Sequence, residues 1–161
     1  TDIIDWVYPT AESKKYQAMN IGKLDNMGYS VDAALHLQEL LPKFFITRIK
    51  AGYAFIHQKH STDGDVFGSL YALEYLRHKA TLQLDHRIWR QLTASWALRW
   101  QERMNGYHPY TKVDVRLQWS APTYNIYVKA DNITNHHYYD LGNVKQPGIW
   151  VMAGASVKLK F

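Results

Sequence analysis

The chain has 161 residues, of which 47% are hydrophobic and 14% are aromatic. It contains no cysteine, which excludes disulfides, thiolate metal sites and cysteine nucleophiles. The net charge is +5, but the nineteen Lys and Arg are interleaved with fourteen Asp and Glu, so we do not expect a nucleic-acid-binding protein. No apolar run approaches the roughly 20 residues of a transmembrane helix, so we do not expect a helical membrane protein.

Alternation of apolar and polar residues predicts β-strands along the whole chain, because successive side chains of a strand point to opposite faces. About eight strands are expected. In residues 69–78 leucines recur at helical spacing, and we allow a short helix there. In chain order, the predicted strands cover residues 2–8, 17–38, 44–57, 79–88, 92–100, 112–119, 124–131 and 149–161.

The connections between these strands alternate between short and long. Short connections are predicted around residues 41–42, 89–91 and 121–122, and longer ones around 9–16, 58–72, 104–110 and 132–147. Antiparallel up-and-down barrels of outer membranes have short periplasmic turns and longer external loops. The sequence therefore predicts an all-β transmembrane barrel whose last strand ends on the periplasmic side.

Aromatic residues near the strand ends and the length of the strands favour a membrane barrel over a soluble β-sandwich. The strands run for about 9 to 15 residues, longer than the typical five or six of globular sheets. A small closed porin-like barrel of eight strands and a soluble β-sandwich binding module remain the alternatives. The aromatic residues assigned to the apolar face are Trp89, Trp100, Trp119, Tyr124 and Trp150, and the basic residues assigned to the opposite face are Arg48, Lys50, Arg87, Arg99, Arg116 and Lys129.

Two stretches carry a resemblance to a known family. Residues 131–139 are Asp-Asn-Ile-Thr-Asn-His-His-Tyr-Tyr, and Gln-Pro-Gly-Ile-Trp follows at 146–150. Together they resemble the last hairpin of TonB-dependent outer-membrane receptors, with Ile149 where the family commonly has Arg. Residues 75–84 are similar to a strand of the same family, with Leu76 in place of Pro.

The resemblance implies about the last eight strands of a 22-stranded barrel that takes up siderophore-bound iron, haem or cobalamin. In this family an N-terminal plug domain fills the barrel and TonB supplies energy, and neither plug nor TonB box is in this sequence. The implied partners are outer-membrane lipid, the rest of the barrel, the plug, TonB through the missing N-terminal part, and the barrel-insertion machinery through the C-terminal strand. The motif residues expected to have structural or insertion roles are Asn132, Asn135, Tyr138, Tyr139, Gly148 and Phe161.

Tyr107, His108 and Tyr110 are the candidate ligand contacts, because they lie in a predicted outer loop. For the tyrosines at 138 and 139 we prefer stacking to ligand contact. We expect no cofactor, no bound metal and no enzymatic activity, since no nucleophile motif surrounds residues 85–86. The pairs at 57 and 60 and at 136 and 137 are interpreted as solvated histidines, and Asp63-Gly64-Asp65 as a turn.

Overall fold

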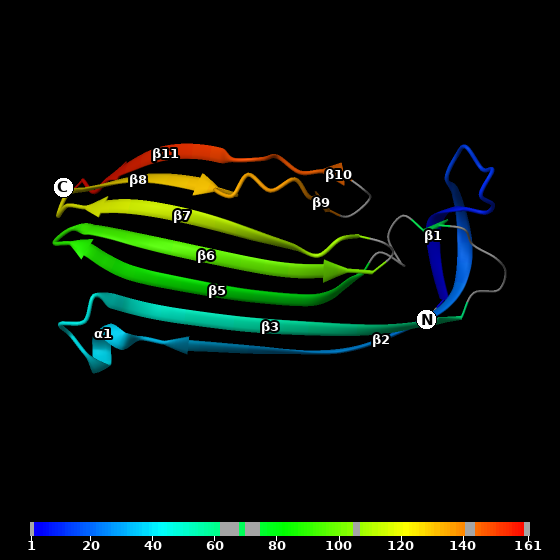
Figure 1. Cartoon of the computed structure of the whole chain (residues 1–161), viewed down its shortest axis with the longest axis horizontal. Helices are drawn as coiled ribbons and strands as arrows, with labels where there is room; N and C mark the ends of the chain where they lie inside the picture. Colours follow the sequence, from blue (N-terminus) through cyan, green and yellow to red (C-terminus); the bar gives the residue numbers. More distant parts are fainter. Residues whose placement is uncertain (1, 62–67, 70–74, 105–106, 141–143, 160–161) are drawn as a thin grey trace.

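The computed structural model describes residues 2–61, 68–69, 75–104, 107–140 and 144–159. Almost all of them lie in antiparallel β-structure, as the alternation predicted (Figure 1). The strands are β1 (Asp2–Tyr8), β2 (Gln17–Leu35), β3 (Ile46–Ser61), β4 (Gly68–Ser69), β5 (Leu76–Trp89), β6 (Leu92–Arg103), β7 (Tyr110–Ser120), β8 (Tyr124–Asp131), β9 (Tyr139–Asp140), β10 (Val144–Lys145) and β11 (Trp150–Val157), and one short helix, α1, covers Leu37–Leu40.

Nine of these strands form one sheet in the order β11-β8-β7-β6-β5-β3-β2-β1-β4, and β9 and β10 form a separate hairpin. Every pairing in the sheet is antiparallel. From β2 to β11 each long strand lies beside the next long strand of the chain, which is an up-and-down arrangement. The eight predicted strands are all present: those at 2–8 and 124–131 match β1 and β8, and the other six are shifted by a few residues at their ends.

Long and short connections lie at opposite ends of the sheet (Figure 1). The turns at residues 90–91 and 121–123 lie at one end, and the connections at 104–109 and 132–149 lie at the other. The prediction of a short turn around residues 41–42 is wrong. The connection there covers residues 36–45, because α1 forms a helical turn before Pro42, which cannot continue a helix.

The helix that we allowed at residues 69–78 falls partly on residues 70–74, outside the described residues. From Leu76 onward the chain is already strand β5. The leucine spacing does not produce a helix in the described residues 76–78. From there on, residues 78, 80, 82 and 84 alternate onto one face of a paired strand.

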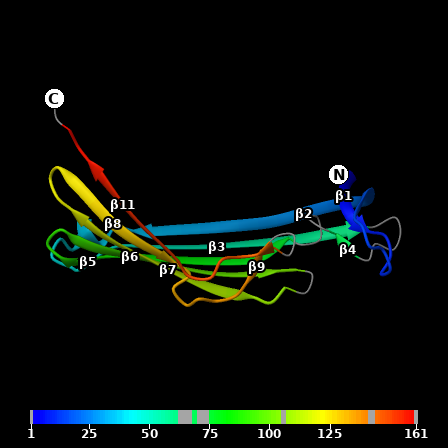
Figure 2. The same cartoon turned by 90° about the horizontal axis from the view of Figure 1, so that it is seen from above.

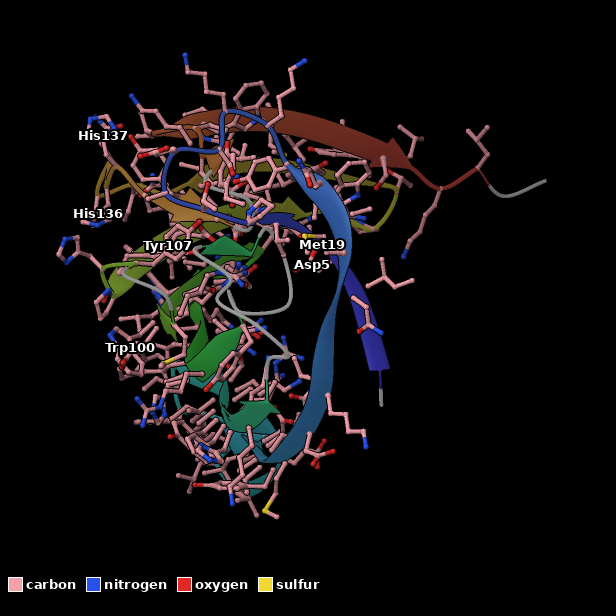
Figure 3. The ribbon with its side chains drawn as sticks, turned by 90° about the vertical axis from the view of Figure 1, so that its right-hand side faces the viewer. Asp5, Met19, Trp100, Tyr107, His136 and His137 are labelled. Carbon is pink, nitrogen blue, oxygen red and sulfur yellow. The ribbon has the colours of Figure 1, made fainter. Side chains whose placement is uncertain are left out.

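The sheet is a single curved layer (Figures 2 and 3). Among the described residues, only Val7, Leu24, Ala94 and Tyr110 are buried hydrophobic residues. A β-sandwich buries an apolar face of each of its two sheets against the other. The described part of the chain has no such core, and the sandwich alternative finds no support in the fold.

The sheet does not close on itself within the described residues. β11 pairs only with β8, and β2 from Leu24 to Leu35 pairs only with β3, since β1 adjoins the beginning of β2. These two edges are the outer limits of the seven long strands β2 to β11. The small closed barrel would require pairing between them, which the described residues do not show.

Candidate functional site

The strand register gathers the apolar side chains of all seven long strands on one face. Ala51 lies opposite Leu82, Leu82 opposite Leu98, and Leu98 opposite Val113. Figure 3 looks along the strands and shows Trp100, a member of this face, on the outer side of the curve. We call this surface the convex face. The polar residues that alternate with it form the concave face.

Apolar residues of the convex face are exposed on all seven long strands, which reverses the arrangement of a water-soluble sheet. In β8, Tyr124, Ile126 and Val128 are 40%, 49% and 46% exposed. Asn125 and Lys129, which alternate with them on the concave face, are only half exposed or less. Large contiguous apolar surfaces are rare on soluble monomers and mark contact with a membrane or another protein.

An aromatic cluster lies on the convex face at the end where the long connections are found. The ring centroids of Tyr29 and Phe55 are 5.7 Å apart, those of Phe55 and His78 are 4.9 Å apart, and those of His78 and Trp100 are 6.2 Å apart. The hydroxyl of Tyr53 lies 2.7 Å from Nδ1 of His78. These rings from four neighbouring strands form a continuous belt.

A second aromatic group lies toward the short-turn end. The rings of Trp89 and Trp119 are 6.5 Å apart, and the ring of Phe45 is 6.4 Å from that of His86. The indole of Trp96 donates a hydrogen bond to Nε2 of His86 at 3.1 Å. Between the two groups the convex face is mainly aliphatic.

On β5 the outermost members of the two aromatic groups, His78 and Trp89, are separated by about the thickness of a membrane, whereas on β6 Trp96 and Trp100 lie only four residues apart. Eleven residues separate His78 from Trp89 along β5, which is about 36 Å at roughly 3.3 Å per residue. A strand tilt of about 40° reduces this to about 28 Å, near the apolar band of roughly 25 Å in outer-membrane barrels. The assignment of Trp150 to the apolar face is wrong. Trp150 pairs with Asp131, so its side chain lies on the concave face.

Ion pairs and a cation–π contact organise the concave face. Arg48 and Asp85 are 2.6 Å apart, and Lys129 and Asp131 are 2.9 Å apart. Beside them, the guanidinium of Arg116 lies over the ring of Tyr127 at 4.1 Å. The same ring covers Gly154, where an added Cβ would come within 2.6 Å of it. This face therefore presents fixed charge, as water or a polar occupant would require.

Asn132 has a structural role that its sequence motif did not specify. It is only 1% exposed and adopts a positive φ of 52° directly after β8. Its side-chain oxygen accepts hydrogen bonds from the backbone N–H of His136 at 3.0 Å and the hydroxyl of Thr134 at 3.3 Å. Its amide donates to the carbonyl of His136 at 2.9 Å and to that of Pro147 at 3.4 Å. One side chain thus joins both ends of the 132–149 connection.

Asn135 and Gly148 complete this junction. The side-chain oxygen of Asn135 accepts a hydrogen bond from the backbone N–H of Ile149 at 3.0 Å. A Cβ on Gly148 would lie 2.3 Å from that same oxygen. A residue without a side chain at 148 is therefore required for the close approach, and both motif positions stabilise the path of the chain into β11.

The predicted aromatic contacts have different environments. Tyr110, at the long-loop end of β7, is buried and stacks on Tyr138 with a centroid distance of 4.3 Å. His108 is exposed and Tyr107 is partly exposed. Ligand binding by these residues stays a prediction, although the stacking of Tyr110 on Tyr138 gives both a structural role.

The 132–149 connection is fastened to its neighbour by a second contact. Arg103 at the end of β6 forms an ion pair with Asp140 in β9. Tyr139 is 46% exposed. Phe161, the last of the motif positions, lies outside the described residues, as do the side chain of His60 and the turn predicted at 63–65.

We did not place two histidines, His78 and His86, on the convex face from the sequence. His78 and His86 follow the same period of two as Ala80, Leu82 and Leu84, so the alternation itself contained this signal. Among the residues that the structure describes, there is no group of three or more His, Cys, Asp or Glu that could hold a metal ion. Within the same residues, no helix is long and apolar enough to cross a membrane.

No protein-family model, curated protein or solved structure matches the chain. The two faces of the sheet, its open edges and the resemblance of residues 131–150 are the features that bear on function.

Proposed function

We propose that the chain is part of the wall of a TonB-dependent outer-membrane receptor that takes up a metal chelate such as siderophore-bound iron, haem or cobalamin. The observation that carries this proposal is the apolar convex face, exposed over seven strands and bounded by two aromatic groups. Lipid tails would cover the aliphatic band, and the aromatic rings would lie at the two membrane interfaces.

The open edges support a larger barrel. An unpaired backbone group in hydrocarbon costs several kcal/mol, so a sheet edge within a membrane requires a partner strand. Under the proposal, earlier strands of the same barrel pair with β2 and with β11. A plug domain then fills the space beside the concave face, and TonB supplies the energy for transport.

The junction around Asn132 supports the assignment to this family. The residues that carry the resemblance form one hydrogen-bonded unit, from the backbone N–H of Asn132 on Asp114 at 2.8 Å to the contact of Asn135 with Ile149. In the proposed receptor this unit ends strand β8 at the outer surface and begins the last strand. Strand β11 then offers its open edge to the barrel-insertion machinery.

Folding in water and in lipid tests the membrane half of the proposal. The intact gene product that contains this chain, unfolded in urea, is diluted either into buffer or into phosphatidylcholine vesicles, and far-ultraviolet circular dichroism and protease resistance are measured. We expect β-structure and protection only with vesicles, because the convex face has no other cover. Equal folding and protection in buffer without lipid would contradict it.

Uptake by cells tests the transport half. In a strain that lacks the gene encoding this chain, we expect uptake of at least one radiolabelled chelate, of ferric iron, haem or cobalamin, to fall to background. Restoring the intact gene should recover uptake, and a protonophore should abolish it because TonB depends on the proton gradient. Unchanged uptake of all three classes would contradict the proposed substrate class.

A further inference from the structure

The cationic side chains of the concave face fall into two groups. Lys112 lies 3.4 Å from Asp114, and Arg48 and Lys129 have carboxylates at 2.6 and 2.9 Å. Lys50, Lys79 and Arg99 form no ion pair with any residue in the described ranges. Three cations without acidic partners thus lie together in one area of the concave face, whereas Arg87 and Arg116, which also form no ion pair within the described residues, lie outside it.

These three cations border two adjoining hollows near the middle of the sheet. One hollow of about 150 Å³ is bordered by Lys79, and the other, of about 220 Å³, by Lys50 and Arg99. Asp32 and Thr81 border both. Thr81 lies opposite Gly52 on one neighbouring strand and opposite Arg99 on the other, so a single cross-strand row joins the two hollows.

Small residues create this space. Gly52 and Ala97 occupy positions on the concave face where the neighbouring rows carry long side chains. A Cβ on Gly52 would lie 2.5 Å from a carboxylate oxygen of Asp32 and 2.9 Å from the hydroxyl of Thr81. These two polar groups thus converge over the glycine and are directed into the hollows.

The local charge is positive. Asp114, which borders the larger hollow, is already engaged by Lys112 and by the backbone N–H of Asn132 at 2.8 Å. Asp32 is then the one acidic side chain to offset Lys50, Lys79 and Arg99 among the described residues that border the hollows. An ammonium or guanidinium group without a carboxylate partner forms strong hydrogen bonds with carboxylate or phosphate oxygens.

We propose that the two hollows form one binding site for a small anion that carries carboxylate or phosphate groups. Lys50, Lys79 and Arg99 supply the charged contacts, and Gln83, whose amide donates one N–H to Asp85 at 3.3 Å, has a second N–H for a neutral hydrogen bond. The inference rests on the proposed function for its role in transport, where it places an anionic solute against the wall at mid-height. The charged and polar side chains assigned to the site all lie on the concave face.

Titration with inorganic phosphate tests the site. The intact gene product that contains this chain, folded in detergent micelles and verified by circular dichroism, is titrated at low ionic strength, and binding is measured by isothermal calorimetry. We expect Arg99→Gln and Lys50→Gln each to weaken binding by about tenfold or more, because each removes a charge-assisted hydrogen bond. Ala97→Leu should also weaken binding, since it fills the larger hollow without changing the charge.

Arg87→Gln is the matched control. Arg87 is a concave-face arginine that lies outside both hollows and has no ion pair within the described residues. Its replacement should change phosphate affinity less than about twofold, as expected for an exposed charge that makes no direct contact. Equal weakening by Arg87→Gln and Arg99→Gln would show diffuse attraction to a basic surface and would overturn the site.

A six-residue glutamate peptide distinguishes a small solute from an acidic protein segment. If the peptide binds and phosphate does not displace it, the proposal is overturned in favour of a protein partner. If the protein folded in micelles binds no phosphate, the proposed anion site is wrong and the membrane proposal is unaffected. If the protein is equally folded without detergent and still binds phosphate, the anion site is supported and the membrane proposal is contradicted.

Discussion

The convex and concave faces of the sheet share the same strands but have opposite chemistry. Leu98 on the convex face is 38% exposed, whereas Gln101 on the concave face of the same strand is only 5% exposed. In a soluble protein, burial would follow apolarity. On this sheet apolar side chains are exposed instead, so substitutions on the two faces should have unequal effects.

A charge introduced on the convex face should have the largest effect. Leu98→Arg should lower the free energy of unfolding in phosphatidylcholine vesicles by about 2 to 4 kcal/mol, the usual cost of a cation at the middle of a bilayer. Ala97→Arg, one residue earlier and on the concave face, is the control and should cost less than about 1 kcal/mol. Denaturant titration measures both, and equal losses would remove the distinction between the faces.

Removal of the Asn132 side chain should have the next largest effect. Asn132→Ala deletes four hydrogen bonds made by a buried side chain, so we expect a loss of about 2 to 3 kcal/mol. Asn125→Ala, in the same strand region but with one exposed side-chain contact to Ser156 at 3.3 Å, should cost less than about 0.5 kcal/mol. Protease cleavage within residues 132–149 should increase only in the first variant.

Substitution of Gly148 should have a smaller effect. Gly148→Ala pushes the Asn135 side chain away and breaks its bond to Ile149, which should cost about 1 kcal/mol. Combining it with Asn135→Ala should cost no more than Asn135→Ala alone, because the bond is already lost. Additive losses in unfolding experiments would show that the crowding at Gly148 has another source.

The exposed ion pair between Arg48 and Asp85 should contribute least. Arg48 is 41% exposed, so Arg48→Gln should change the unfolding free energy by less than about 1 kcal/mol. The change should shrink further at 1 M salt, where exposed charges are screened. A loss above 2 kcal/mol that persists in high salt would show that this part of the concave face is shielded from water.

The sequence predicted the strands and their faces well because both depend on a local period of two. Residues 112–119 and 124–131 gave the positions and the face assignment of β7 and β8. The sequence did not reveal the helical turn at 36–45, since its form depends on how four residues close before a proline. It also placed Trp150 on the wrong face, because apolarity at a strand end is a weak guide to the direction of one side chain.

The candidate sites were less predictable, since they depend on pairings between distant residues. The motif identified Asn132 and Asn135, but their roles required knowing that residues 132–136 lie beside 147–149. The hollows of the concave face likewise depend on register, which brings Gly52 beside Thr81 and Thr81 beside Arg99. No pattern within one strand indicates which cations will find an acidic partner on the next.

A nitroxide scan of β6, a strand with neighbours on both sides, tests whether the convex face of the sheet contacts lipid. The chain has no cysteine, so single cysteines at residues 95 to 99 can be labelled without background. In vesicles, labels at 96 and 98 should collide mainly with oxygen dissolved in lipid, and those at 95, 97 and 99 mainly with a water-soluble nickel complex. Access to the nickel complex that shows no alternation along the strand would contradict a lipid-facing convex surface.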